Sequence, residues 1–283
     1  MLSHPGFILH GGFMKKIRLG RTGLMVTDVS FGALPIQRID AQSAVKLLRR
    51  AYDGGINYFD TANMYSDSEY KLGLALSDVR HDIVISTKTG ATDKKTALAH
   101  IENSLMMLRT DYIDILQLHN PAVLPDRDDP DSAYAAALEM KKKGFVRHIG
   151  ISNHRMNIAV AAIESGDYET LQFPFSYIAS KEELKLPGLC READMGFIAM
   201  KGLAGGLLNN AAACAAFMRQ YDNVAPIWGI QRESELEEFL ALGAMDEIPV
   251  TAELEAVMER DRKELSGNFC RSCGYCLPCP AGI

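Results

Sequence analysis

The chain has no long apolar run and no excess of positive charge, and both absences limit what it can do. No apolar stretch in its 283 residues approaches the ~18 residues of a membrane-spanning helix, so the sequence predicts no membrane partner. The formal net charge is −6. Because phosphate backbones are bound by basic surfaces, this balance argues against nucleic acid as a main partner. The composition, 47% hydrophobic and 23% charged, is typical of an ordinary globular protein with an ample core.

Common nucleotide-binding motifs and a secretion signal are also missing. No Gly-x-Gly-x-x-Gly turn follows the first predicted strand, and no Walker loop occurs anywhere. The opening residues lack the basic segment and long apolar core of a signal peptide. Met14-Lys15-Lys16 resembles a second start, and we expect residues 1–13 to be a poorly ordered extension.

The six cysteines are not spread along the chain as a disulfide framework would spread them. Cys190 and Cys214 are isolated, and the other four crowd the end of the chain. This distribution predicts reduced thiols and a cytoplasmic location.

Short apolar segments alternate with helical patterns along the chain. A hairpin is predicted from residue 16 to 26, and eight strand-like segments follow it, often continuously apolar as in parallel strands covered on both faces. They are residues 29–34, 57–60, 83–88, 112–119, 148–152, 171–175, 196–201 and 224–230. Eight strand–helix units in series predict an α/β fold, a (β/α)8 TIM barrel. We expect the barrel in residues 14–245 and a C-terminal helix with a cysteine cluster in residues 246–283.

Four residues with acid–base side chains stand where these strands end. Asp60 closes the second strand, Tyr65 lies in the loop after it, Lys88 closes the third and His119 the fourth. Active sites of TIM barrels gather at the C-terminal ends of the strands, so these side chains can converge. Singly, they have ordinary explanations: a loop cap, a surface aromatic, a snorkelling lysine and a turn residue. Jointly, they favour a proton-donating catalytic site.

This combination and order resemble the aldo-keto reductases, whose catalytic tetrad is Asp, Tyr, Lys and His. The resemblance covers roughly residues 14–242 and implies hydride transfer between NAD(P)H and a small-molecule carbonyl or alcohol. Tyr65 would donate the proton, although a free tyrosine has a pKa of ~10. A cationic Lys88 would lower that pKa, and Asp60 would keep Lys88 charged and oriented. His119 would donate a hydrogen bond to the carbonyl oxygen.

The resemblance also implies a nicotinamide lying across the barrel mouth. Ser152, Asn153 and Gln172 would bind its carboxamide, although Ser152 or Asn153 can equally cap the helix that starts near residue 154. Small residues after strand seven would let backbone N–H groups approach the pyrophosphate. The implied cofactor contacts are Gly32, Ala33, Asp60, Ser152, Asn153, Gln172, Met200, Lys201, Gly202, Leu203, Gly229 and Arg232.

Two positions depart from the family pattern. Relatives often place an aromatic residue near position 200 to stack on the nicotinamide, where this chain has Met200. Many relatives hold the 2′-phosphate of NADP with a lysine and two arginines after strand eight, where this chain has Arg232 among several glutamates. Like-charge repulsion from the glutamates would weaken phosphate binding. On the resemblance NADP(H) is the first choice of cofactor, with NAD(H) close behind.

The end of the chain carries four closely spaced cysteines, Cys270, Cys273, Cys276 and Cys279. Such thiolates can wrap one small cluster, and the proline after the last is typical of bacterial ferredoxins, although the last gap is one residue short of their spacing. Structural zinc sites usually separate two pairs by a longer loop, so an iron–sulfur ligand set is favoured over zinc. Plain reduced thiols are a third interpretation.

A subgroup of aldo-keto-reductase-like proteins carries a similar Cys-x-x-Cys-Gly-Tyr-Cys-x-Pro-Cys-Pro string after the barrel. Those proteins usually continue into a second ferredoxin-type cysteine set, whereas this chain stops at Ile283, which leaves assembly of a [4Fe-4S] cluster open. The alternative functions are an electron-transfer oxidoreductase with a ferredoxin-like partner and a non-catalytic nucleotide-binding barrel. An intact tetrad counts against the last of these.

Overall fold

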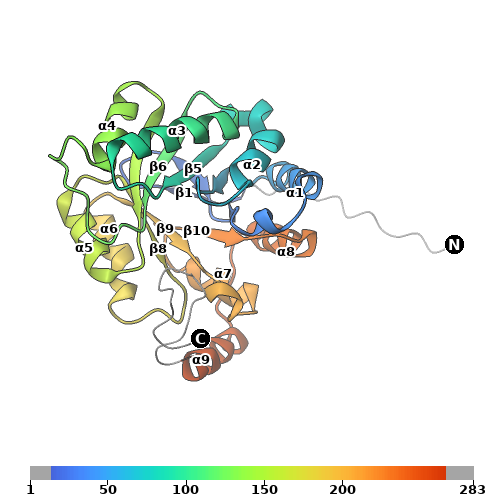
Figure 1. Ribbon diagram of the computed structural model, residues 1–283. Helices are drawn as coiled ribbons and strands as arrows, with labels where there is room; N and C mark the ends of the chain where they lie inside the picture. The colour runs from blue at the N-terminus through green and yellow to red at the C-terminus, as the bar shows by residue number, and fades with distance from the viewer. Residues whose placement is uncertain (1–13, 266–283) are drawn as a thin grey trace, which may run out of the picture.

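The computed structural model describes residues 14–265. The predictions for residues 1–13 and for Cys270, Cys273, Cys276 and Cys279 therefore lie outside the described residues. Within them, eight parallel strands close into a barrel in the order β10-β3-β4-β5-β6-β7-β8-β9 (Figure 1). The strands are β3 (Ser30–Gly32), β4 (Tyr58–Asp60), β5 (Val84–Thr89), β6 (Ile113–His119), β7 (Val146–Ser152), β8 (Thr170–Pro174), β9 (Gly196–Met200) and β10 (Val224–Gly229).

The predicted (β/α)8 barrel is confirmed, and each predicted strand is present with ends shifted by at most two residues. The strands are followed in turn by the helices α1 (Ala41–Asp53), α2 (Ser68–Leu76), α3 (Lys94–Leu108), α4 (Ala133–Lys142), α5 (Met156–Ser165), α6 (Leu186–Glu192), α7 (Ala211–Met218) and α8 (Glu233–Gly243). Single 3-10 turns are η1 (Pro35–Arg38), η2 (Ser77–Asp82), η3 (Glu183–Lys185) and η4 (Ala204–Gly206). Asp40, Asp93, Ser132 and Asn210 cap α1, α3, α4 and α7 by accepting a backbone N–H.

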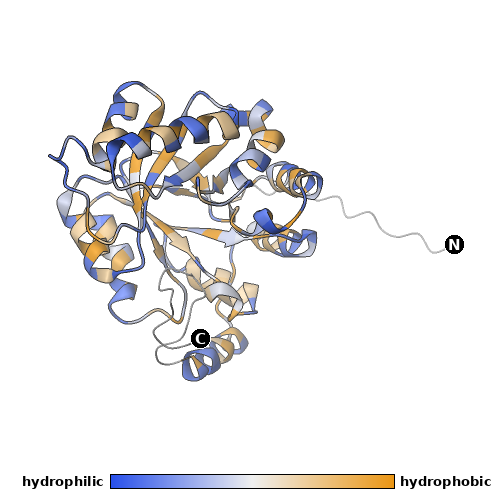
Figure 2. Ribbon diagram, in the orientation of Figure 1, coloured by the Kyte–Doolittle hydropathy of each residue, from blue (hydrophilic) through white to orange (hydrophobic). Residues whose placement is uncertain are grey.

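Strand alternation divides the apolar side chains into two clusters, one inside the barrel and one between barrel and helices. Successive residues of a strand point to opposite faces, so Tyr58 joins the inner cluster and Phe59 the outer one. Figure 2 shows the result: apolar strands, and helices whose outward faces are hydrophilic. The predicted hairpin, β1 (Lys16–Arg18) and β2 (Met25–Thr27), adds Ile17 and Val26 to the inner cluster and closes one end of the barrel.

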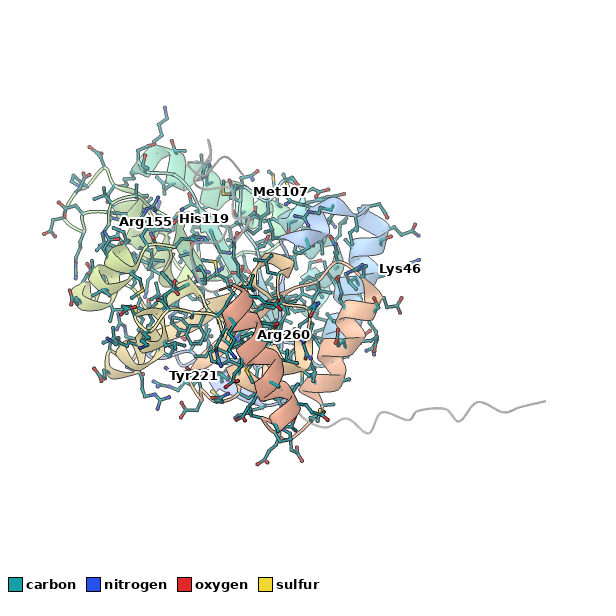
Figure 3. The ribbon with its side chains drawn as sticks, turned by 90° about the horizontal axis from the view of Figure 1, so that it is seen from below. Lys46, Met107, His119, Arg155, Tyr221 and Arg260 are labelled. Carbon is teal, nitrogen blue, oxygen red and sulfur yellow. The ribbon has the colours of Figure 1, made fainter. Side chains whose placement is uncertain are left out.

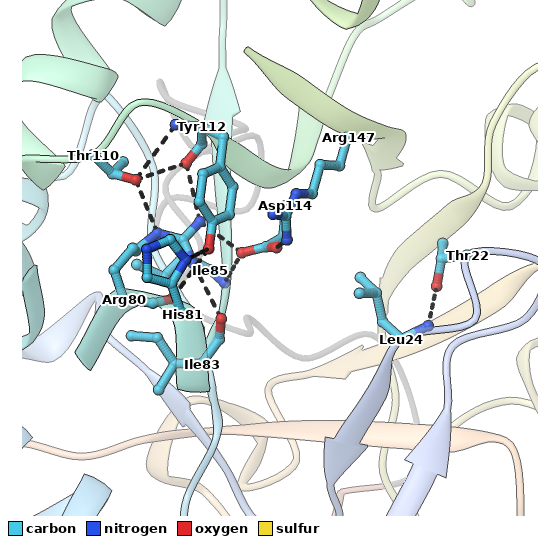
Figure 4. A network of polar contacts seen from close by, with 10 residues as sticks. All are labelled: Thr22, Leu24, Arg80, His81, Ile83, Ile85, Thr110, Tyr112, Asp114 and Arg147. Atoms are coloured by element: carbon cyan, nitrogen blue, oxygen red, sulfur yellow. Dashed lines mark hydrogen bonds and ion pairs between the residues drawn. The ribbon is translucent and has the colours of Figure 1, made fainter. Parts of the chain in front are cut away.

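A buried charged network lies at the start of β6, at the opposite end of that strand from His119 (Figure 4). Asp114 Oδ2 accepts a hydrogen bond from the Arg80 guanidinium at 2.7 Å, and Oδ1 accepts one from Arg147 at 2.9 Å. Both guanidinium carbons lie over the Tyr112 ring, 4.0 and 3.7 Å from its centroid. Because a buried charge is costly unless it is paired, Asp114 ties η2 and β7 to β6.

A ninth helix of the described residues, α9 (Ala252–Glu264), packs beside α7 (Figure 1). The Tyr177 hydroxyl donates to Asp261 Oδ2 at 2.5 Å, and Arg262 Nε donates to the Tyr177 carbonyl at 2.8 Å. Burial and the Asp261 carboxylate raise the pKa of Tyr177 well above its ordinary value, so the phenol stays a donor. In the part of the chain that the structure describes, every helix is too short or too polar to cross a membrane.

Candidate active site

The site is centred on a buried ion pair between neighbouring strands. Lys88 is 1% exposed, and its Nζ donates to Asp60 Oδ2 at 2.6 Å and to the Thr61 carbonyl at 2.6 Å. The other carboxylate oxygen of Asp60 accepts from Ser86 Oγ at 2.6 Å. Burial lowers the pKa of Lys88 below its ordinary value, although Asp60 and Glu69 oppose the shift. The ammonium is thus a strong donor that is already oriented.

Tyr65 is held above this pair by the backbone of its own loop. The Thr61 and Asn63 N–H groups donate to the Ser86 and Lys88 carbonyls at 2.9 and 3.0 Å, which continues the β4–β5 ladder into the loop. The Tyr65 ring centroid then lies 5.4 Å from Lys88 Nζ. An ammonium beside a phenol favours the phenolate, which is what a tyrosine needs in order to act as an acid near neutral pH.

His119 packs edge-on against Tyr65, with ring centroids 5.9 Å apart and planes at 82°. Burial, with the positive charges of Lys88 and His154 added, lowers the pKa of His119 from 6.5 to about 3. The imidazole is therefore neutral at physiological pH, where it can donate one N–H but cannot serve as the acid. Arg155 lies nearby on the same side of the molecule and donates to the Asn120 side chain at 3.3 Å (Figure 3).

The residues expected at the nicotinamide carboxamide differ in their hydrogen bonding. Ser152 is 2% exposed, and its Oγ has no hydrogen-bond partner among the described residues. Such a buried orphan fits a ligand amide group. Gln172, its register neighbour on β8, has Oε1 bonded to Gln117 and Nε2 directed at Met200 Sδ, 3.7 Å away. A sulfur atom is a weak acceptor, so this amide can also donate elsewhere.

Asn153 does not cap α5, which begins at Met156 with Arg155 as its N-cap and without a side-chain cap, so the capping alternative is wrong; Asn153 closes the turn before the helix instead. Its Oδ1 accepts the N–H groups of His154 and Arg155, both at 2.9 Å, and its Nδ2 donates to the Pro121 carbonyl at 2.9 Å. These bonds shape the turn between β7 and α5. One amide proton of Asn153 remains available for a ligand.

Packing explains the glycines around the mouth. A Cβ on Gly202 would lie 2.5 Å from the Trp228 ring, and one on Gly32 would lie 3.1 Å from the Trp228 carbonyl oxygen. A Cβ on Gly229 would approach Pro35 to 3.2 Å. The glycine at position 202 is thus required by Trp228, whether or not a phosphate binds beside it. Of the other expected contacts, Ala33 is buried, whereas Lys201 and Leu203 are partly exposed.

Arg232 is exposed at the beginning of α8 and is already engaged by a carboxylate. Its Nε donates to Glu235 Oε1 at 2.8 Å, and Glu235 Oε2 accepts the Gln231 and Arg232 N–H groups at 3.0 and 3.1 Å. Glu235 therefore caps the helix and neutralises Arg232 at once. The tetrad and the other positions expected at the mouth lie at one end of the barrel. The Arg232 side chain, in contrast, is bonded to its own helix.

Three buried polar residues of this region were not foreseen from the sequence. Ser86 and Gln117 precede Lys88 and His119 by two positions, so strand alternation alone puts them on the same inner face. Glu69, on α2, is 3% exposed and accepts from Thr87 Oγ1 at 2.5 Å. Burial raises the pKa of Glu69, and no local pattern in the sequence indicates its partner.

The described residues contain no group of three or more potential metal ligands. The barrel, its polar mouth and the buried Lys88–Asp60 pair define the class of site expected of a carbonyl-reducing barrel enzyme. The model of the aldo/keto reductase family matches residues 28–216. The chain belongs to this family of NAD(P)H-dependent oxidoreductases.

Individual relatives agree with this assignment. The chain is 31% identical to the uncharacterized oxidoreductase YqkF of Bacillus subtilis over 209 residues, which cover 69% of this chain and 67% of that protein. It is 30% identical to L-galactose dehydrogenase of Arabidopsis thaliana over 217 residues, covering 69% and 68%. In fold it resembles aldo-keto reductase AKR11C1 of Bacillus halodurans, with a TM-score of 0.76, 24% identity, and 88% and 96% coverage.

Proposed function

We propose that the protein reduces a small-molecule carbonyl with a hydride from NADPH and that Tyr65 supplies the proton. The observation that carries the proposal is the buried Lys88–Asp60 pair, 2.6 Å apart, with Tyr65 stacked over it and a neutral His119 at its edge. A pure nucleotide-binding barrel has no need of an ammonium desolvated beneath a phenol.

Each residue has a separate task. Lys88 favours the phenolate of Tyr65 and so makes the phenol a better acid, while Asp60 holds the ammonium in place. His119, uncharged, donates one hydrogen bond to the substrate oxygen and fixes its position beside the Tyr65 hydroxyl. When the carbonyl oxygen gains negative charge, the Tyr65 proton moves to it, and Lys88 stabilises the phenolate that remains.

The residues at the mouth fit a nicotinamide. Ser152 and Gln172 would bind its carboxamide, with the second amide proton of Asn153 available to the same group. When bound, the dinucleotide supplies the hydride. The main-chain N–H groups around Lys201, Gly202 and Leu203 would face the pyrophosphate, while Gly32, Ala33, Met200 and Gly229 would line the mouth. NADPH remains the first choice over NADH on family membership, with Arg232 as the residue for the 2′-phosphate.

The test is Tyr65→Phe, with the exposed Tyr70→Phe on α2 as a matched control. We expect Tyr65→Phe to lose roughly 10²- to 10⁴-fold in kcat for an aromatic aldehyde, because it removes the general acid. NADPH binding, followed by fluorescence titration, should be retained, and Tyr70→Phe should behave like the wild type. Full activity of Tyr65→Phe would refute the assignment.

The iron–sulfur cluster predicted from the sequence needs a separate test. Iron analysis and visible absorption after anaerobic purification would test an iron–sulfur cluster on Cys270, Cys273, Cys276 and Cys279, and an iron-free protein would contradict it. The family matches support neither the electron-transfer enzyme with a ferredoxin-like partner nor the non-catalytic barrel. A cytoplasmic location stays a prediction.

A further inference from the structure

Gln117 is fully buried inside the barrel, directly below the candidate active site. Parallel register places it opposite Lys88 on β5 and Gly150 on β7. A Cβ at Gly150 would overlap Thr170 Oγ1 and lie 3.3 Å from Gln117 Cγ, so the glycine makes room first for Thr170 and also for Gln117. A buried amide is costly unless it is hydrogen-bonded, and Gln117 Oε1 has no partner among the described residues, so this side chain is held in the core at a cost to stability.

The side chain joins two strands that do not touch each other. Gln117 Nε2 donates to Asp60 Oδ1 on β4 at 3.3 Å and to Gln172 Oε1 on β8 at 2.6 Å. In the barrel order, β5, β6 and β7 lie between β4 and β8. One amide group thereby connects the ion pair of Asp60 and Lys88 to the residue expected at the nicotinamide carboxamide.

The chemistry of the two partners fixes which way each amide points. Asp60 Oδ1 belongs to a carboxylate and can only accept, so the amide nitrogen of Gln117 must face it. The same nitrogen then requires an acceptor from Gln172. The amide orientation of Gln172 follows, because its Oε1 is the acceptor and its Nε2 points away toward Met200 Sδ. Gln172 therefore offers an N–H donor at the mouth, while Ser152 Oγ remains available as an acceptor. A carboxamide has an acceptor oxygen on one side and an NH2 donor group on the other, so Gln172 and Ser152 together favour one of its two orientations.

We infer that Gln117 is a positioning residue, which sets the amide of Gln172 for the nicotinamide carboxamide and couples it to the Asp60–Lys88 pair. The inference rests on the proposed function and deepens it. Gln117 touches neither cofactor nor substrate, yet its loss should weaken cofactor binding and turnover together. The effect on cofactor binding should run through Gln172.

The experiment is a double-mutant cycle of Gln117→Leu with Gln172→Leu, measured on the full chain in the Kd for NADPH and in kcat/KM for an aldehyde. Gln117→Leu alone should lose about 5- to 100-fold in kcat/KM, because a buried donor to two oxygens is removed. In the Kd for NADPH, the double variant should be only about as impaired as Gln172→Leu. In contrast, the losses of Gln117→Leu and Ser152→Ala should multiply, because Ser152 is not bonded to Gln117.

Controls separate positioning from a general packing defect. Ile115 lies on the same strand and the same inner face as Gln117, and its side chain is apolar. Ile115→Val should therefore keep both Kd and kcat/KM within about twofold of the wild type. If Gln117→Leu fails to fold, Gln117→Met, which is unbranched and of similar size, replaces it in the cycle. Multiplying losses in the Gln117–Gln172 cycle would overturn the inference.

The inference and the proposed function fail in different ways. An active wild type with independent Gln117 and Gln172 effects overturns only the inference. A wild type that binds NADPH without reducing any carbonyl overturns the proposed function. The double-mutant cycle, measured in the Kd for NADPH, then still tests whether Gln117 positions Gln172. Failure to bind either NADPH or NADH overturns both.

Discussion

The depressed pKa of His119 predicts that folding stability depends on pH between about pH 5 and 7.5. A histidine in an unfolded chain titrates near its ordinary pKa of 6.5, whereas His119 in the folded protein titrates at about 3. At a pH between these two values, the histidine is protonated in the unfolded chain and unprotonated in the native state. By linkage, stability rises with pH wherever the unfolded state binds more protons, so His119 destabilises the fold as pH falls below 6.5.

The magnitude follows from the two pKa values. At about pH 5 the unfolded histidine is almost fully protonated, and the native one is neutral. One pH unit corresponds to about 1.4 kcal/mol, so lowering the pH from about 7.5 to about 5 should remove about 2 kcal/mol from the free energy of unfolding. Any native pKa below about 4 gives nearly the same figure, because His119 then stays neutral throughout the window.

The assay is urea unfolding followed by the fluorescence of Trp228, which is the one tryptophan in the sequence and is buried against Phe239. His119→Asn removes the titrating group, so its stability should fall by about 2 kcal/mol less than that of the wild type over this window. His81→Asn, which removes an exposed histidine, is the control and should retain the wild-type pH dependence. Equal pH dependence in the wild type and His119→Asn would refute the reasoning.

Two further predictions concern charged groups away from the tetrad. Asp114→Ala leaves the Arg80 and Arg147 guanidinium groups without their shared carboxylate, and it should lower the free energy of unfolding by about 3–5 kcal/mol in a urea titration, because one of these charges is buried. Retained stability would show that this network is dispensable. Glu235→Gln should free Arg232 and tighten NADPH about threefold relative to NADH in parallel titrations, a small effect because the arginine is exposed. An unchanged ratio of the two Kd values would remove Arg232 from the cofactor site.

Much of the fold follows from local patterns in the sequence. The barrel strands are short, apolar and regularly spaced, and parallel strands buried on both faces leave that signature in any order of packing. The chain order also places Asp60, Lys88 and His119 at successive strand ends. Since every parallel strand of a barrel ends at the same mouth, convergence of these side chains needed no coordinates.

Partners across the barrel could not be predicted in that way. The two-residue period puts Gln117 on the inner face, yet only closure and register bring its amide to Asp60 on one side and to Gln172 on the other. Likewise, the glutamates near Arg232 are visible in the sequence, but the capping geometry of α8 selects Glu235 as its partner.

The barrel, the order of the tetrad and the family pattern could all be predicted from the chain, because they depend on periodicity and on neighbours along it. The neutral state of His119 and the desolvation of the Lys88 ammonium could not be predicted in this way, because both depend on burial and on charges from other strands. Only the folded structure shows that Gly202 makes room for Trp228. Solvent exclusion and side-chain packing act through space, and they are set only when the strands have closed.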